Sequence, residues 1–128
     1  MQALLDTHAL LWWLSGDPRL SARARTVIAD EGNAILVSAA SAWEIATKVR
    51  SGKLPGAETL AAEFTVQMAA QNFAGLPITL DHAQRAGSLP GPLRDPFDRM
   101  LIAQSQAENL PVVGLDKAFD DYRVARLW

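Results

Sequence analysis

The sequence predicts an α/β protein, a three-layer α/β/α sandwich built on a mostly parallel sheet of four to five strands. Short apolar runs typical of buried strands alternate along the chain with longer stretches whose apolar residues recur at helical spacing. This order favours parallel strands joined by crossover helices, which then cover both faces of the sheet. Because no repeat, linker or low-complexity segment interrupts the pattern, we expect residues 1–128 to form a single domain.

The expected strands are short and almost wholly apolar, as strands buried on both faces of a parallel sheet should be. Turn-forming residues such as Gly, Pro and Asn separate them from the helical stretches. We expect strands at residues 2–5, 34–37, 76–80 and 112–115, and residues 124–127 are the candidate for a fifth.

The expected helices are bounded by residues that suit their ends. Ser21, Asp81 and Asp95 are placed to cap three of the helices. Pro96 fits the first position of the last helix, and Gly52 ends another. We expect helices at residues 7–14, 21–30, 38–51, 58–73, 82–88 and 96–109.

The composition limits the classes of protein to which the chain can belong. Apolar residues make up 49% of the chain, which is enough to bury a core and excludes a disordered protein. The longest unbroken apolar run, residues 9–14, is far shorter than the roughly 20 residues that cross a bilayer. With no cysteine there is no disulfide, thiolate metal site or cysteine nucleophile. Because the start of the chain also lacks a signal peptide, we expect a cytoplasmic protein without a membrane partner.

The net charge of −2 gives the chain no general attraction for nucleic acid. If four of the 14 acidic residues were gathered in one site, 10 would remain elsewhere against 12 Lys and Arg. That surplus of basic residues is slight, so the composition permits an RNA partner without predicting one.

Four acidic residues, Asp6, Glu44, Asp98 and Asp116, are expected to meet at one edge of the sheet. Asp6 and Asp116 each follow a strand, and the carboxyl ends of neighbouring parallel strands share an edge where sites gather. Glu44 and Asp98 are expected in the first turns of helices that begin near this edge. The four carboxylates would then converge on one pocket.

Each of these acids also has an ordinary structural interpretation. Asp6 and Asp116 suit helix caps, and Asp98 suits the positive end of its helix. Glu44 can complete a capping box with the serine three positions earlier, or pair with Lys48 four positions later. Taken singly, none of the four indicates chemistry.

Together, the four carboxylates would need a counter-charge. Two like charges about 4 Å apart repel by roughly 4 kcal/mol at an effective dielectric constant near 20. Either some of the acids stay protonated or a cation lies among them. Mg²⁺ or Mn²⁺ fits a site built only of oxygen ligands, and such an ion can activate water and stabilise charge on a phosphoryl group. The pattern therefore suggests metal-assisted hydrolysis of a phosphodiester.

Four sequence blocks carry a resemblance to a known family. They are LLDTHAL at residues 4–10, SAWEI at 41–45, RDPFDR at 94–99 and LDKAF at 115–119. In order and spacing they resemble the signature blocks of PIN-domain nucleases, and in particular the VapC-type toxins of bacterial toxin–antitoxin pairs. The resemblance covers nearly the whole chain.

The resemblance implies a PIN-like fold and an endoribonuclease that depends on Mg²⁺ or Mn²⁺. It also implies an RNA substrate such as tRNA, rRNA or mRNA, a homodimer, and a small cognate antitoxin protein that holds the enzyme inactive. Asp6, Glu44, Asp98 and Asp116 match the family's acidic quartet, which is catalytic and holds the metal. Thr7 matches a small hydroxyl residue that orients the first acid or a metal-bound water.

The chain departs from the family pattern in two places. Gly114 and Leu115 stand before Asp116, where the family usually has a Thr or Ser. Residues 89–93 lack the histidine and basic residues often seen before the third block. These departures bear on catalytic rate and RNA contacts rather than on the metal site.

Other interpretations stay open from the sequence alone. A phosphatase could use Asp6 as its nucleophile, although His8 stands where such enzymes place a second Asp. A catalytically weak PIN-like domain could instead serve as an RNA- or protein-binding module.

Arg99 suits either a phosphate contact or an ion pair. Further candidate phosphate contacts, each also an ordinary surface residue, are Lys48, Arg50, Lys53, Arg94 and Lys117. Four tryptophans suit a core: Trp12, Trp13, Trp43 and Trp128. Because Trp12 and Trp13 are adjacent and point to different faces of a helix, one of them also suits a partner surface.

Overall fold

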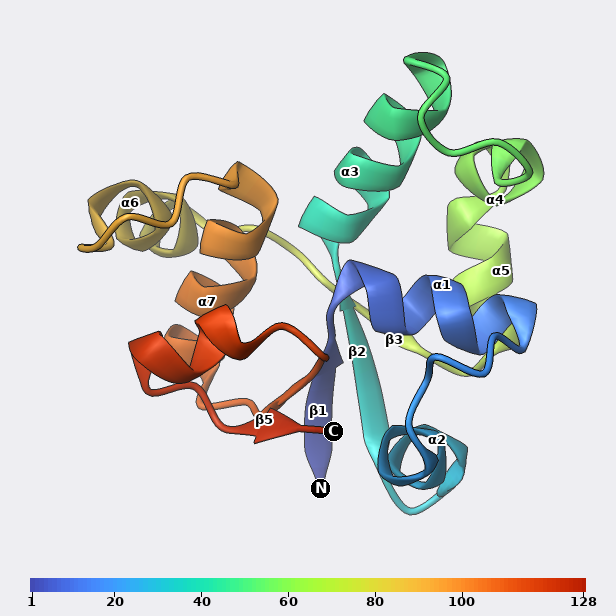
Figure 1. Ribbon diagram of the computed structural model, residues 1–128, viewed down its shortest axis with the longest axis horizontal. Helices are drawn as coiled ribbons and strands as arrows, with labels where there is room; N and C mark the ends of the chain where they lie inside the picture. Colours follow the sequence, from blue (N-terminus) through green and yellow to red (C-terminus); the bar gives the residue numbers. More distant parts are fainter.

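A five-stranded parallel sheet forms the middle layer of the protein, in a computed structural model that describes all residues from Met1 to Trp128 (Figure 1). Its strands are β1 (Gln2–Leu5), β2 (Ala34–Ser38), β3 (Ala74–Leu76), β4 (Val112–Val113) and β5 (Arg126–Leu127). They lie in the order β3-β2-β1-β4-β5, and every neighbouring pair is parallel. The predicted sheet is confirmed, and it is parallel throughout.

Seven α-helices and a short 3₁₀ helix connect the strands. They are α1 (Thr7–Ser15), α2 (Ala22–Ala29), α3 (Ala39–Arg50), α4 (Glu58–Ala62), α5 (Phe64–Ala70), α6 (Leu80–Ser88), α7 (Pro96–Glu108) and the 3₁₀ helix η1 (Lys117–Tyr122). Ser21 and Asp95 cap α2 and α7 through side-chain hydrogen bonds, as their sequence positions predict. None of these helices is both long enough and apolar enough to cross a membrane.

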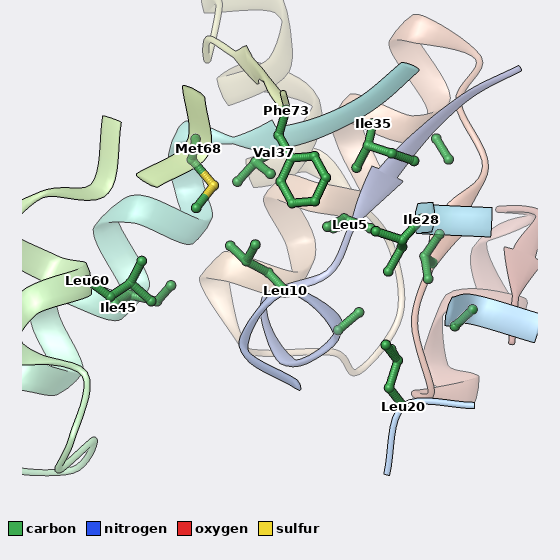
Figure 2. Packing of buried hydrophobic residues seen from close by; sticks show 14 residues of the cluster. Leu5, Leu10, Leu20, Ile28, Ile35, Val37, Ile45, Leu60, Met68 and Phe73 are labelled. Carbon is green, nitrogen blue, oxygen red and sulfur yellow. The ribbon is translucent and has the colours of Figure 1, made fainter. Parts of the chain in front are cut away.

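The two faces of the sheet pack against different helices, which confirms the three layers. On one face, Leu5 of β1 and Ile35 of β2 lie in a cluster with residues of α1 to α5, which Figure 2 shows from close by. On the other face, Leu4 packs with Leu101 and Ile102 of α7. Successive strand residues point to opposite faces, so β1 is buried on both sides. Burial of this extent holds the carboxyl end of β1 in a fixed place.

The third strand and the helix after it do not begin where the sequence pattern predicts. The expected strand at residues 76–80 is wrong: β3 ends at Leu76, and Pro77 follows it. Proline has no N–H to donate to a sheet, so pairing stops there. Thr79, rather than Asp81, caps α6, because its hydroxyl accepts from the His82 N–H while the His82 ring accepts from the Thr79 N–H.

The helix predicted at residues 58–73 is two shorter helices. The backbone leaves the helical conformation at Glu63, where φ is −121° and ψ is 31°. Leu60 of α4 and Met68 of α5 are nevertheless buried in the same cluster. The break therefore does not change which face of the sheet this segment covers.

Candidate active site

The carboxyl ends of β1 and β4 lie side by side, as the prediction for Asp6 and Asp116 requires. Leu5 pairs with Val113, and the Asp6 N–H donates to the Val113 carbonyl at 3.0 Å. Asp6 is therefore the first residue beyond β1, and Asp116 follows β4 by three residues. Both carboxylates leave the sheet at the same edge.

Asp6 is a buried carboxylate with one oxygen engaged and one free. Its Oδ1 accepts from the Ala9 N–H at 2.7 Å, which caps α1. Its Oδ2 has no hydrogen-bond partner and lies beside Gly114, where a β-carbon built on that glycine would be 2.5 Å away. The helix-cap interpretation of Asp6 is thus correct, but it uses only half of the carboxylate.

Glu44 is carried by α3, which begins one residue after β2. Ser38 caps this helix by accepting from the Ala40 N–H at 2.9 Å, so Glu44 lies in the second turn rather than the predicted first. The capping box with Ser41 is also wrong. The Ser41 hydroxyl instead lies 2.9 Å from the Thr7 hydroxyl, and both groups are buried. This contact ties the first turn of α1 to the turn of α3 that precedes Glu44.

The Glu44 carboxylate is buried and paired with a cation. The Lys48 ammonium donates to Glu44 Oε2 at 2.6 Å, which confirms the i,i+4 pair. The Lys48 side chain is 36% exposed, whereas that of Glu44 is 6% exposed. Glu44 Oε1 remains without a hydrogen-bond partner, so this acid also keeps one free oxygen.

Asp98 and Asp116 each stand at a helix start. Asp95 caps α7 by accepting from the N–H groups of Phe97 and Asp98, both at 2.9 Å, and Pro96 occupies the first helical position. The half-buried Asp98 carboxylate makes no hydrogen bond. Asp116 caps η1 by accepting from the Ala118 N–H at 2.8 Å.

The four acids lie within one electrostatic environment. Burial raises the pKa of Asp6 to about 7, and the charges of Asp98, Glu44 and Asp116 add to the rise against the opposing Ala9 hydrogen bond. Burial likewise raises the pKa of Asp98 to about 7, with further contributions from Asp95, Glu44 and Asp116. Glu44, Asp98 and Asp116 are therefore near enough to Asp6 for their charges to act on its carboxylate.

The fit of these residues to a divalent cation has two sides. All four are carboxylates, and each keeps at least one oxygen without a hydrogen-bond partner, which suits a hard ion such as Mg²⁺. Their mutual repulsion also favours a cation among them. However, no three acidic or histidine side chains are close enough together to form a metal-binding group. The carboxylate oxygens are therefore suitable ligands for Mg²⁺, but in this structure they do not surround a single point closely enough to coordinate an ion.

A family model for the PIN domain matches residues 3–125, which is nearly the whole chain. The chain belongs to the PIN domain family. The match includes the block around each of the four acids, so it agrees with the resemblance that the sequence blocks indicate.

One curated relative of this PIN domain is "Ribonuclease VapC16" of Mycobacterium tuberculosis (strain ATCC 25618 / H37Rv), which is 44% identical over 73 residues. The match covers 54% of the present chain and 50% of that protein, so the chain spans about half of the length of this relative.

Three solved structures share the fold of this PIN domain. VapBC2 from Rickettsia felis, bound to a DNA fragment from its promoter, is 14% identical with a TM-score of 0.71, covering 98% of this chain and 97% of that one. FitAcB from Neisseria gonorrhoeae is 20% identical with a TM-score of 0.67, covering 98% and 96%. A toxin–antitoxin complex from Klebsiella pneumoniae is 23% identical with a TM-score of 0.57, covering 90% and 87%. At these identities the likeness establishes the fold.

Arg99 of this PIN domain does not form the predicted ion pair, and its guanidinium is occupied by backbone carbonyls. Its guanidinium donates to the carbonyl oxygens of Ala86 at 2.9 Å and of Leu89 and Leu93, both at 2.7 Å. It has no carboxylate partner, and its donors are taken up by the end of α6 and by the loop before α7. Arg99 therefore holds the loop that leads to Asp98.

Sequence reasoning missed the role of Gly114. The sequence shows Gly114 only as one of two residues that stand where the family usually has a Thr or Ser. The signal that could have identified it is its position after the apolar run of β4: Leu5 pairs with Val113, so the next residues, Asp6 and Gly114, stand opposite one another. A glycine facing a carboxylate at the edge of a sheet suggests a close approach.

Proposed function

We propose that this PIN domain is an endoribonuclease that hydrolyses RNA phosphodiester bonds with Mg²⁺ or Mn²⁺. The observation that carries the proposal is that Asp6 and Asp116 follow the neighbouring parallel strands β1 and β4. Burial and the charges of the neighbouring carboxylates raise the pKa of Asp6 and Asp98 at this place. Groups perturbed in this way by burial and specific partners are typical of functional sites. The ribonuclease name of the curated relative supports the same activity.

In this proposal Asp6, Asp98, Glu44 and Asp116 hold the metal through their free oxygens. When bound, the ion would supply Lewis acidity toward the phosphodiester and lower the pKa of a coordinated water. Asp6 is fixed by the sheet and by its cap to α1, so it offers the most rigid oxygen of the four. Asp98 and Asp116 are more exposed, which suits ligands that close on an ion as it binds.

Two further residues have supporting roles in the proposed site. The Thr7 hydroxyl is committed to Ser41, so we assign it to holding α1 against α3 rather than to contacting the metal. Lys48 partly neutralises Glu44 and is exposed enough to meet a phosphate of the substrate. Thr7 would then act through the position of α3, and Lys48 through Glu44 and the phosphate of the substrate.

We further propose that the enzyme acts in the cytoplasm as a homodimer that a small cognate antitoxin holds inactive. The support is the resemblance of the sequence blocks to VapC-type toxins, together with the structural neighbours, which include VapBC2 and another toxin–antitoxin complex. Co-expression with the protein encoded beside it, followed by purification and a cleavage assay, tests this partner directly.

The activity is tested by incubating the purified chain with RNA and Mg²⁺ or Mn²⁺. We expect cleavage that EDTA stops and that Asp6→Asn or Asp98→Asn abolishes. Asp81→Asn is the matched control, because Asp81 is an exposed acid paired with Arg85 on α6. Cleavage that survives both site substitutions would reject the assignment, and RNA binding without cleavage would favour the binding-module alternative.

A further inference from the structure

An exposed aromatic pair connects α3 and α7. Trp43 of α3 is 59% exposed, and its ring centroid lies 4.9 Å from that of Phe97 in the first turn of α7. The two rings are inclined by 80°, which is the edge-to-face arrangement that aromatic pairs prefer. A contact between separate helices fixes the position of the indole without burying it.

Each member of this pair is adjacent to one of the four acids. Trp43 directly precedes Glu44, and Phe97 directly precedes Asp98. Neighbouring residues on a helix point about 100° apart. Glu44 is therefore buried while the adjacent Trp43 faces solvent. Figure 1 shows that the first turns of α3 and α7 lie at the end of the sheet where β1 finishes. The aromatic pair therefore stands at the rim of the acidic site.

The exposure of Trp43 is not explained by the fold. Tryptophan is highly buried on average, yet Trp43 belongs to neither hydrophobic cluster, although the sequence suits it to a core. The neighbouring Ile45 is fully buried and already anchors α3 to the core. An aromatic ring that is fixed by a second ring and open to solvent beside a charged site is available for contact with a ligand.

We propose that Trp43, held by Phe97, is a stacking platform for one unpaired nucleobase of the RNA, next to the phosphodiester at the acidic site. The proposal rests on the proposed function and names the part of the substrate that this rim recognises. An edge-to-face contact with Phe97 occupies only part of the indole, and the exposed remainder is free to stack. Single-stranded RNA is commonly recognised in this way, because every base has an aromatic face.

The exposed face of α3 favours a nucleobase over a protein segment. Its exposed residues are Ala39, Trp43, Ala46 and Arg50, spaced so that they share one face of the helix. Trp43 is the only large apolar side chain among them, whereas a docked protein helix usually needs several apolar anchors along its length. One aromatic ring followed by an arginine suits a base and the phosphate beside it.

The platform predicts a preference for unpaired RNA. A base within a duplex is stacked on both faces and cannot meet the indole, whereas a base in a loop or single strand can. Cleavage should therefore occur in loops or single-stranded segments. Loss of Trp43 should raise KM for such RNA more than it lowers kcat, because the stacked base contributes to binding rather than to the reacting bond.

Binding is measured in an Asp6→Asn background with Mg²⁺, so that a short single-stranded oligoribonucleotide of mixed sequence stays intact. We expect Trp43→Ala to weaken its affinity by about tenfold, within the range seen for stacked bases, and Trp43→Phe to retain most of it. Leu80→Ala is the matched control, because Leu80 is 92% exposed at the start of α6, beyond the far end of α7. Melting temperatures should be unchanged for Leu80→Ala and should fall by only a few degrees for Trp43→Ala, as the loss of one edge-to-face contact allows.

A second measurement replaces single nucleotides of the same oligonucleotide with abasic ones. One abasic position should weaken binding to the unsubstituted Trp43 protein and have no further effect in Trp43→Ala. Equal affinities for the Trp43 and Trp43→Ala proteins would overturn the platform, and weakened binding of a protein partner alone would assign the aromatic pair to that interface instead. If the native chain cleaves RNA but Trp43→Ala leaves KM unchanged, only the stacking proposal is rejected. If the native chain neither binds nor cleaves RNA, the proposed function is rejected together with the stacking proposal.

Discussion

The carboxylate of Asp6 occupies the space that a side chain on Gly114 would need. A β-carbon on Gly114 would lie 2.5 Å from Asp6 Oδ2, a distance that real β-carbons essentially never show, and 3.0 Å from its Cγ. Asp6 cannot move aside easily, because its side chain is short and its Oδ1 is held by the Ala9 N–H. The glycine that departs from the family pattern is therefore what lets this carboxylate sit at the sheet edge.

Substituting Gly114 should consequently disable the site. We expect Gly114→Ala to lower RNA cleavage at least tenfold, because the carboxylate of Asp6 must shift. The crowding should also cost about 1–3 kcal/mol of unfolding free energy, measured by urea denaturation. Gly75→Ala is the control, since a β-carbon on Gly75 would meet nothing within 4 Å. Undiminished cleavage by Gly114→Ala would show that the position of Asp6 is not critical.

Asp6→Asn should separate stability from activity. The asparagine side chain can still cap α1. The substitution removes a buried carboxyl group whose pKa is raised to about 7, and with it the buried negative charge. We expect the metal-free variant to be more stable than the native chain by about 1–3 kcal/mol at a pH near 8, while RNA cleavage is lost. Asp81→Asn should change neither property. A variant less stable than the native chain would mean that the Asp6 charge is well compensated without a metal.

Stability without a metal should fall as pH rises. A carboxyl group with a raised pKa binds its proton more tightly in the folded state, so its contribution is fully present below the unfolded value of 3.8. That contribution is lost progressively between this value and about 7, the pKa of Asp6 and Asp98. Mg²⁺ should therefore raise Tm more at about pH 8 than at about pH 5. A metal-dependent rise in Tm that is equal at both pH values would contradict the proposed ligands.

The elements that position the site were predictable because their signals are local. The apolar run before Asp6 and the Asp95-Pro96 start of α7 each depend on a few adjacent residues, and both are found as expected. Residues 76–80 were misassigned because Ile78 and Leu80 alternate as in a strand. Pro77 and the Thr79 cap decide instead for a helix start.

Features that depend on contacts between distant segments were not predictable. Asp6 and Asp116 can approach one another only if β1 and β4 are neighbours, and the order of strands in the sheet cannot be read from the sequence. The partners of Arg99 are backbone carbonyls, whose directions no residue pattern reveals. The exposure of Trp43 likewise depends on how α3 lies against α7.

Arg99→Lys should destabilise the loop before α7 rather than weaken RNA binding. A lysine ammonium is a single point donor and cannot reach the carbonyls of Ala86, Leu89 and Leu93 together, as the planar guanidinium does. We expect a loss of about 2–3 kcal/mol of unfolding free energy, with reduced cleavage because this loop leads to Asp98. Arg94→Lys is the control, since Arg94 is exposed and makes no side-chain hydrogen bond, and it should leave Tm unchanged. An unchanged Tm for Arg99→Lys together with a higher KM for RNA would contradict this interpretation and return Arg99 to the role of a phosphate contact.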